Sequence, residues 1–309
     1  MGYEYLESPL CFVDVGARGE PSQPFADMQK KMPKLIRIIS FEPDHSASLL
    51  INKTIGGEVI NKAAWKEETE LTLFVTSDNS ASSVFKPSES TAAQFDSLHF
   101  NARNVIRTEK ISAIALDDAL RDIEDIGGSF LKCDTQGSEF EVVVGASDFL
   151  KTRCVGLTME CWTQPVYEGL STVDEVISLV RSLDFEIFDF QISAAWNRNL
   201  DGLSLIRKKQ VVGIDFLAFK KIDSFYMTEP SAEESMRFVL LADLWGFPDL
   251  SLQILKHKSC KIDQTTRTKL VESIFKLRKS RRFENKHFIF HRDLIRSKFK
   301  IRPRFPFIH

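Results

Sequence analysis

Short apolar runs alternate with stretches of helical periodicity from the N-terminus to about residue 220. Most of these runs are continuously apolar, which is typical of strands buried on both faces of a parallel sheet. Strands that alternate with helices predict an α/β sheet with helices on both faces. The predicted strands of this sheet are Cys11–Val15, Leu35–Phe41, Glu58–Ala63, Phe130–Asp134, Val155–Glu160, Phe185–Phe190 and Ile214–Phe219. Two further runs, Leu71–Val75 and Lys110–Leu116, predict strands inserted before the fourth strand of the main sheet.

Capping-box patterns mark the expected starts of three helices. In this pattern a Ser or Thr precedes the helix and a Glu follows three residues later, so each side chain bonds the backbone N–H of the other residue. The pairs are Ser138 with Glu141, Thr172 with Glu175 and Ser231 with Glu234. The first two helices lie between predicted strands, as a crossover between parallel strands requires.

The alternation of strands and helices ends near Pro230, and the chain beyond it has helical periodicity only. We expect helices at Ser235–Trp245, Ser251–Lys258 and Gln264–Lys279. The sequence therefore predicts two parts, a sheet domain over residues 1–227 and a helical C-terminal segment over residues 228–309.

The two parts differ in charge, although the whole chain has a net charge of only −2. From Thr228 onward there are 18 Lys and Arg against 9 Asp and Glu, whereas the residues before it contain 23 against 34. The basic residues are densest between Lys276 and Arg304. A basic tail beside an acidic body suggests contact with an anionic group, either on an external partner or on the acidic body itself.

Composition argues against several classes of protein. No apolar run reaches the ~18 residues of a membrane-spanning helix, and the N-terminus lacks the basic and apolar stretches of a signal peptide. The five cysteines are odd in number and include no Cys-x-x-Cys pair, so we expect neither a disulfide framework nor a metal site. These features favour the reducing cytoplasm as the compartment.

A glycine turn follows the first predicted strand, in the sequence Phe12-Val-Asp-Val-Gly-Ala-Arg-Gly19. Glycine has no Cβ, so Gly16 and Gly19 let a ligand approach the backbone closely. In open α/β sheets this first turn is where nucleotide-like cofactors bind. A tight structural turn without a ligand is the alternative interpretation of so short a pattern.

Acidic residues end or follow three of the predicted strands. Glu42 lies 26 residues after Gly16, where a carboxylate can accept hydrogen bonds from an unphosphorylated ribose. Asp134 and Glu160 end the fourth and fifth strands. Because the carboxyl ends of parallel strands form the ligand crevice, we expect these three side chains along one rim of the sheet. Each of them alone is also compatible with an ordinary exposed acid.

Together these motifs resemble the FkbM methyltransferases, a family within the seven-stranded class of S-adenosylmethionine-dependent enzymes. The family's segment after the fourth strand reads Lys-Ile-Asp-Val-Glu-Gly-x-Glu, and residues 132–139 match it at Lys132, Asp134, Gly137 and Glu139. Ser82-Ser83 is similar to a serine pair after the family's inserted hairpin, and Leu116-Asp117 is similar to its Leu-Asp stretch. The resemblance covers about residues 10–220 and implies a Rossmann-like, seven-stranded methyltransferase sheet.

The resemblance also implies S-adenosyl-L-methionine as the cofactor and assigns residues to it. The residues implied at its methionine end are Asp14, Gly16, Ala17, Arg18, Gly19 and Asp134, and those implied at its ribose and adenine are Glu42, Pro43, Asn61 and Ala63. Two departures from the family pattern bear on this site. Arg18 replaces the usual Asn, and Glu20-Pro21-Ser22 delays the first helix.

The implied reaction is O-methylation of a hydroxyl on a saccharide or related small molecule. A hydroxyl is a weak nucleophile at neutral pH, so a positioned base should assist it. Asp134 is the first candidate for this catalytic base, Glu160 the second and His45 the third, while Asp134 also fits a role at the helix start or on the cofactor's amino group. The substrate-binding candidates are Lys132, which we expect to pair with these acids, and Trp162 and Tyr167, whose rings either stack on a sugar or pack as loop anchors.

Two other functions fit the sequence. An NAD-dependent oxidoreductase is compatible with the fold, but the turn lacks the full Gly-x-Gly-x-x-Gly pattern and the sequence shows no evident catalytic Tyr-x-x-x-Lys. The second is a non-catalytic Rossmann-like binding module that docks an anionic partner. For the basic C-terminal segment we weigh an anionic substrate such as a charged glycan, peripheral contact with a membrane surface, and a subunit interface in an oligomer. We expect no nucleic-acid partner, because no RNA- or DNA-binding motif occurs.

Overall fold

The computed structural model describes residues 2–17, 25, 28–29, 32–55, 57–96, 101–199 and 208–281, which form two compact units. One unit runs from Leu6 to Ile262 and contains every described strand. The other consists of Met1–Tyr5 and the chain from Asp263 onward. Its described elements are a 3-10 helix, η1 (Gly2–Tyr5), and helix α12 (Gln264–Arg281).

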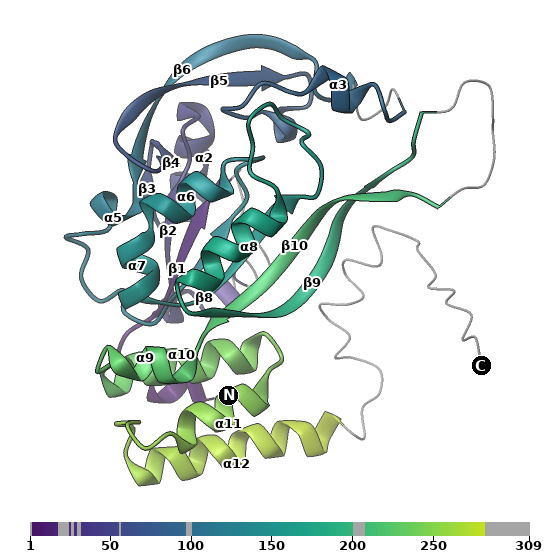
Figure 1. Ribbon diagram of the computed structural model, residues 1–309. Helices are drawn as coiled ribbons and strands as arrows, with labels where there is room; N and C mark the ends of the chain where they lie inside the picture. The colour runs from purple at the N-terminus through teal and green to yellow at the C-terminus, as the bar shows by residue number, and fades with distance from the viewer. Residues whose placement is uncertain are drawn as a thin grey trace, which may run out of the picture. The chain divides into compact units, whose positions relative to one another are not determined.

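A seven-stranded sheet forms the centre of the unit Leu6–Ile262, with the strand order β3-β2-β1-β7-β8-β10-β9 (Figure 1). Its strands are β1 (Leu10–Val15), β2 (Ile36–Phe41), β3 (Glu58–Ile60), β7 (Ser129–Cys133), β8 (Cys154–Trp162), β9 (Phe185–Trp196) and β10 (Gln210–Lys220). β10 is antiparallel to both of its neighbours, and the other pairs are parallel. The predicted α/β sheet of seven strands is therefore confirmed. The chain places β2 and β3 on one side of β1 and later adds β7 on the other side, so the carboxyl ends of β1 and β7 flank the usual ligand crevice of α/β sheets.

The sheet is covered on both faces, as its continuously apolar strands predict. Neighbouring residues of a strand point to opposite faces. Leu131 of β7 belongs to a buried cluster that includes Val142 and Val143 of helix α6. Phe130, the residue before it, stacks on Trp245 beyond the other face, with ring centroids 5.1 Å apart. Each face of β7 is therefore inside a hydrophobic core.

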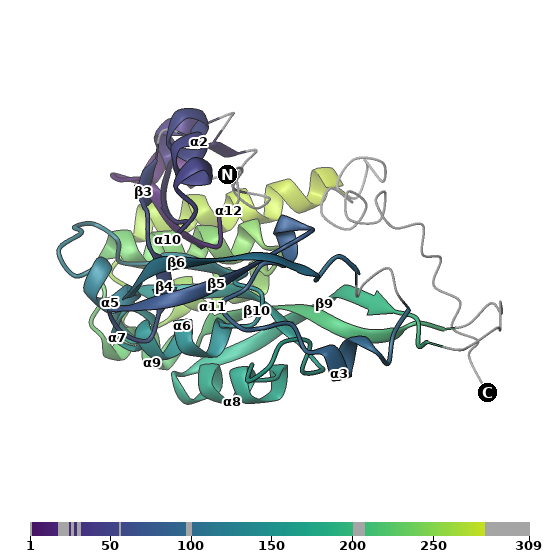
Figure 2. The same cartoon turned by 90° about the horizontal axis from the view of Figure 1, so that it is seen from above.

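A second sheet contains three strands in the order β4-β6-β5. They are β4 (Ala63–Trp65), β5 (Thr69–Thr76) and β6 (Val105–Ala115), of which β6 is parallel to β4 and antiparallel to β5. Figures 1 and 2 show β5 and β6 as a twisted pair of strands, and β6 contacts α6. The single strand predicted at Glu58–Ala63 is wrong, because β3 ends at Ile60 and β4 begins in the other sheet. Asn61 lies between the two strands, and its side-chain amide donates to the backbone oxygens of Glu42 (2.8 Å) and Pro43 (3.1 Å).

Two of the three predicted capping boxes are present, at Thr172 with Glu175 and at Ser231 with Glu234. The box predicted at Ser138 is wrong, because the Ser138 side chain makes no capping hydrogen bond. The described helices of the unit Leu6–Ile262 are η2 (Pro33–Leu35), α2 (His45–Ile55), η3 (Asn79–Ala81), α3 (Glu89–Ala92), α5 (Leu116–Ala119), α6 (Glu139–Gly145), α7 (Ser147–Thr152), α8 (Val173–Ser182), α9 (Ile222–Met227), α10 (Ala232–Leu244) and α11 (Pro248–Lys256).

The helical region after the sheet begins inside the same compact unit. Helices α9, α10 and α11 lie before Ile262, and α10 contacts β7 and β8. The division predicted at residue 228 stays a prediction, and the unit that contains the sheet continues beyond it. Most of the densest basic stretch, Lys276–Arg304, lies after Arg281, outside the described residues. Within the described chain, no helix has both the length and the hydropathy needed to cross a bilayer.

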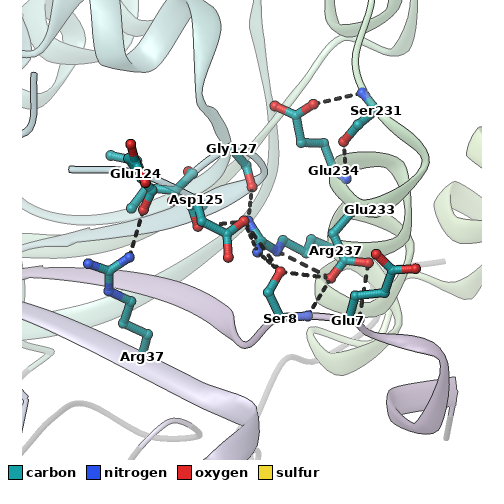
Figure 3. A network of polar contacts seen from close by, with 12 residues as sticks. Glu7, Ser8, Arg37, Glu124, Asp125, Gly127, Ser231, Glu233, Glu234 and Arg237 are labelled. Atoms are coloured by element: carbon teal, nitrogen blue, oxygen red, sulfur yellow. Dashed lines mark hydrogen bonds and ion pairs between the residues drawn. The ribbon is translucent and has the colours of Figure 1, made fainter. Parts of the chain in front are cut away.

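A buried arginine joins α10 to the sheet (Figure 3). The Arg237 side chain is 1% exposed, and its Nη1 donates to the backbone oxygens of Asp125 (3.0 Å) and Gly127 (2.6 Å). Its Nη2 forms an ion pair with the Asp125 carboxylate at 2.8 Å and also bonds the Ser8 hydroxyl. Glu233, one turn earlier, accepts from the backbone N–H of Ser8 at 3.1 Å. These bonds connect α10 to the segments that lead into β1 and β7, at the amino ends of the strands.

Candidate functional site

The turn after β1 touches the turn after β7. Gly16 has a φ of +78°, and a Cβ at this position would lie only 2.0 Å from the backbone oxygen of Asp134. The Gly16 N–H donates to the Phe41 oxygen of β2 at 3.2 Å, and the Asp134 N–H donates to the Val15 oxygen at 3.1 Å. Glycine is required here for both its positive φ and its close backbone approach. Ala17 is buried beside this turn, and Arg18 and Gly19 lie outside the described residues.

Lys132 occupies the crevice between two acids. Its ammonium nitrogen lies 3.4 Å from Oδ1 of Asp14 and 3.7 Å from Oδ2 of Asp134, and it donates to the Gly16 backbone oxygen at 3.3 Å. Burial raises the pKa of Asp14, and Lys132 opposes this rise. Burial disfavours the charged form of Lys132, but the carboxylates of Asp14 and Asp134 outweigh it and raise the lysine pKa. Lys132 therefore stays a cation and pairs with the site acids.

Glu42 and Asn61 form a second group at the same edge of the sheet. Glu42 is almost fully buried and accepts the N–H of Asp44 at 2.9 Å, while its own N–H donates to the Ile60 oxygen at 3.2 Å. Nδ1 of His45 lies 3.3 Å from Oδ1 of Asn61. The structure therefore places His45 beside Asn61, on the predicted ribose and adenine side. Pro43 follows Glu42 directly, and Ala63 begins β4 just after Asn61.

Two of the predicted rim acids meet at one glutamine. Nε2 of Gln136 donates to Oδ1 of Asp134 at 2.9 Å and to Oε2 of Glu160 at 2.7 Å. Burial, followed by the charge of Asp134, raises the pKa of Glu160 well above that of an ordinary glutamate. The Asp134 side chain is 37% exposed, so it can reach a ligand in the crevice. The structure thus brings both candidate catalytic acids together, with Lys132 on the other side of Asp134.

The loop that carries Gln136 is held by a buried acid. Gln136 has a φ of +59° and Gly137 a φ of +117°. The Glu139 carboxylate accepts the N–H groups of Thr135 (2.9 Å) and Gly137 (3.0 Å), and burial raises its pKa to about 7. Glu139 therefore holds the left-handed loop that precedes α6. This loop aims the Gln136 amide at the two acids.

Asp215 is a site acid that the sequence did not reveal. In the antiparallel β8–β10 pair, Asp215 lies directly opposite Glu160. Burial, together with the charge of Asp134, raises the pKa of Asp215 to about 7. The available signal was a lone acid inside the otherwise apolar predicted strand Ile214–Phe219. Gln136 was also missed, because nothing local in the sequence shows where its amide points.

The two aromatic candidates are buried beside this cluster. Trp162 is 3% exposed and Tyr167 is 0% exposed. The Arg103 guanidinium lies over the rings of Trp162 (5.1 Å) and Trp196 (4.6 Å). The Tyr167 hydroxyl lies 2.8 Å from the Ala81 backbone oxygen and 3.2 Å from Oε1 of Gln136. In this structure both rings pack as anchors, and their predicted stacking on a substrate stays a prediction.

A pocket of about 240 Å³ lies near Tyr167, whose neighbour Val166 lines it. Phe95, Val166 and Trp196 are among its apolar lining residues. The remaining lining residues are Lys86, Pro87, Ser88, Glu89, Ala92, Arg103, Asn104 and Val105. Tyr167 links this pocket to the acids, because its hydroxyl meets Gln136 and its ring lies 5.7 Å from the guanidinium carbon of Arg103.

The geometry fits the methionine and ribose ends of S-adenosylmethionine. Among the described residues, Oδ1 of Asp14 is buried and has no hydrogen-bond partner besides its ion pair with Lys132, so it can accept from an ammonium group. The backbone turn at Gly16 leaves no room for a side chain, and the buried acid Glu42 follows the neighbouring strand. The described residues include no group of acids, cysteines or histidines suited to a metal ion.

Among known protein families and solved structures, several are similar to this chain. The sequence model of the methyltransferase FkbM domain matches residues 14–187, more than half of the chain. Among solved structures, the chain is similar to methyltransferase FkbM from Methylobacillus flagellatus KT, with 15% identity, 67% of this chain and 43% of that chain covered, and a TM-score of 0.37. It is also similar to a protein from Thermobifida fusca YX described as a putative methyltransferase, with 14% identity and a TM-score of 0.31. This match covers 69% of this chain and 74% of that chain. The chain thus spans less than half of the first of these two proteins, and no curated protein matches it. The match to the domain model shows that the chain belongs to the FkbM methyltransferase family.

Proposed function

We propose that this protein is an S-adenosylmethionine-dependent methyltransferase that methylates a hydroxyl oxygen of a saccharide or related small molecule. The observation that carries the proposal is the pair of acids Asp134 and Glu160, joined by Gln136 at the carboxyl ends of β7 and β8. They lie next to the glycine turn and Asp14, within a chain of the FkbM family. Neither the oxidoreductase nor the binding-module alternative gains support from this family.

In this proposal the cofactor would contact residues that follow two neighbouring strands, β1 and β2. Asp14, Gly16 and Ala17 after β1 would hold the methionine part, and Glu42 with Pro43 after β2 would hold the ribose. Asn61 and Ala63 would lie beside the adenine, and Arg18 and Gly19 complete the predicted set outside the described residues. When bound, S-adenosylmethionine supplies an electrophilic methyl group.

The protein's own chemistry is to orient the acceptor hydroxyl and to remove its proton. As the hydroxyl oxygen attacks, Asp134 accepts the proton, a role that general-base catalysis assigns to a positioned carboxylate. Lys132, 3.7 Å from Asp134, favours the ionised carboxylate and fixes its direction. Glu160 is the weaker candidate, because its raised pKa keeps it protonated at neutral pH.

A calorimetric titration tests the cofactor directly. We expect the purified chain to bind S-adenosylmethionine and S-adenosylhomocysteine at micromolar concentration, and NAD not at all. Glu42→Ala should weaken binding about 10- to 100-fold, because it removes the carboxylate that would accept hydrogen bonds from the ribose hydroxyls. Glu186→Ala, which removes an exposed acid from β9, is the control and should bind normally. Binding of NAD alone, or of none of the three ligands, would reject the proposal.

The pocket beside Tyr167 supports an acceptor that contains a ring, since the rings of Phe95 and Trp196 line it. Val105→Trp should fill this pocket, because Val105 lines it and is 41% exposed. We expect the KM of the acceptor found by a saccharide screen to rise at least about tenfold, which is about 1.4 kcal/mol of lost binding, with unchanged cofactor affinity. Ile106→Trp is the matched control, because Ile106 is the next residue of β6, is exposed and does not line the pocket. Equal KM values in the two variants would move the acceptor site elsewhere.

A further inference from the structure

The acid Asp215 has a fixed place in the candidate site. The β8–β10 register sets it opposite Glu160, and residues opposite each other in an antiparallel pair have Cβ atoms about 4.5–5.5 Å apart. On the other side of β10, the register sets it opposite the neutral residue Gln191 of β9. The charged groups that face Asp215 are therefore Glu160 from β8, with Lys132 and Asp134 at the end of β7.

This part of the site contains more acids than bases. Asp14, Asp134, Glu160 and Asp215 gather around one described ammonium group, that of Lys132. Lys132 lies within 4 Å of Asp14 and Asp134. Carboxylates that share a partly buried site cannot all ionise at once, so one of them keeps a proton.

The contacts indicate where the proton resides. Asp134 is stabilised as an anion by Lys132 and by the Gln136 amide. Glu160 accepts the second hydrogen of that amide and has no cationic partner like Lys132 among its described contacts, and its cross-strand neighbour Asp215 is another acid. Burial, followed by the charge of Asp134, raises the pKa of both Glu160 and Asp215, and Asp215 adds to the rise at Glu160, which agrees with a proton held by these two groups beside an ionised Asp134.

We propose that Asp215 is a positioning residue for methyl transfer, which keeps a proton on the Glu160–Asp215 pair and so leaves Asp134 as the ionised base. This inference rests on the proposed function, because it assigns the pair a purpose only if Asp134 accepts the acceptor's proton. Asp215 acts through Glu160 and Asp134, and needs no contact with the substrate.

Carbon-13 NMR of the ligand-free full chain, labelled at the glutamate carboxyl carbon, tests the inference. The Glu160 resonance is identified as the one that Glu160→Gln removes. We expect it to titrate above neutral pH in the wild type. In Asp215→Asn it should titrate about one pH unit or more lower, because a neighbouring negative charge is gone. Asp189→Asn, which removes an exposed acid from β9, is the control for net charge and should leave the resonance unchanged.

An unmoved Glu160 titration in Asp215→Asn, or a wild-type Glu160 that titrates like an ordinary glutamate, would overturn the inference. Asp215→Ser is the second variant should the asparagine variant not fold. The titration needs no cofactor. If the Glu160 titration shifts as expected in Asp215→Asn but the protein does not bind S-adenosylmethionine, both the proposed function and the role assigned to Asp215 are rejected. If the protein binds S-adenosylmethionine but the Glu160 titration does not shift, only this inference is rejected.

Discussion

Asp134→Asn is expected to lower kcat by about 10²- to 10⁴-fold, the range over which a positioned general base contributes. Asparagine keeps the shape of the side chain and can still contact Gln136 and Lys132, so the fold and the cofactor affinity should change little. What is lost is the anion that accepts the hydroxyl proton. The measurement is transfer of a labelled methyl group from S-adenosylmethionine to the acceptor, with calorimetry on the same preparation.

Two companion variants decide between the candidate bases. Glu160→Gln should retain turnover within about tenfold near neutral pH, because glutamine resembles the protonated carboxyl that burial favours at Glu160. Asp118→Asn removes an exposed acid of α5 that pairs with Arg121, and should behave as the wild type. Near-normal turnover in Asp134→Asn with a large loss in Glu160→Gln would make Glu160 the base.

Arg237→Met is expected to lower the free energy of unfolding by about 1–3 kcal/mol, the cost of leaving buried carbonyl oxygens without their hydrogen-bond donor. The change removes the donor from the carbonyl oxygens of Asp125 and Gly127 and the ion-pair partner from the carboxylate of Asp125. Methionine fills much of the volume but cannot hydrogen-bond. Urea unfolding followed by circular dichroism measures the loss.

The control for this variant is Arg121→Met. Arg121 is exposed and pairs with Asp118 at the surface, so its loss should cost less than about 1 kcal/mol. Because the Arg237 network lies at the amino ends of the strands, folded Arg237→Met should still bind S-adenosylmethionine with normal affinity. A destabilisation equal to that of Arg121→Met would show that α10 is held by apolar packing alone.

Local patterns in the sequence were sufficient to predict the main sheet. Strands buried on both faces must be continuously apolar, and so β1, β7 and β8 were visible as short runs of Val, Ile, Leu and Phe. The two confirmed capping boxes were also visible, because such a box depends on residues only three positions apart. The same local logic failed at Ser138, where Glu139 reaches the loop's N–H groups instead.

The candidate site was predicted in part, for a related reason. Parallel strands bring their carboxyl ends to one edge, so a strand-end acid such as Asp134 or Glu160 is placed by topology alone. Whether Trp162 and Tyr167 face a ligand depends on what covers them. In the structure that cover is Arg103 and Trp196, which come from distant parts of the chain.

By itself, then, the sequence determined the order of strands and helices, the glycine turn at Gly16 and the rim acids Glu42, Asp134 and Glu160. Only the tertiary structure decided that Asp215 faces Glu160, that Gln136 joins two acids and that Arg237 is buried rather than part of a basic surface. The physical reason is the distance along the chain between the residues that interact. Strand periodicity and caps are set by neighbours along the chain, whereas cross-strand register, left-handed loop geometry and burial are set by residues that meet only after the chain has folded.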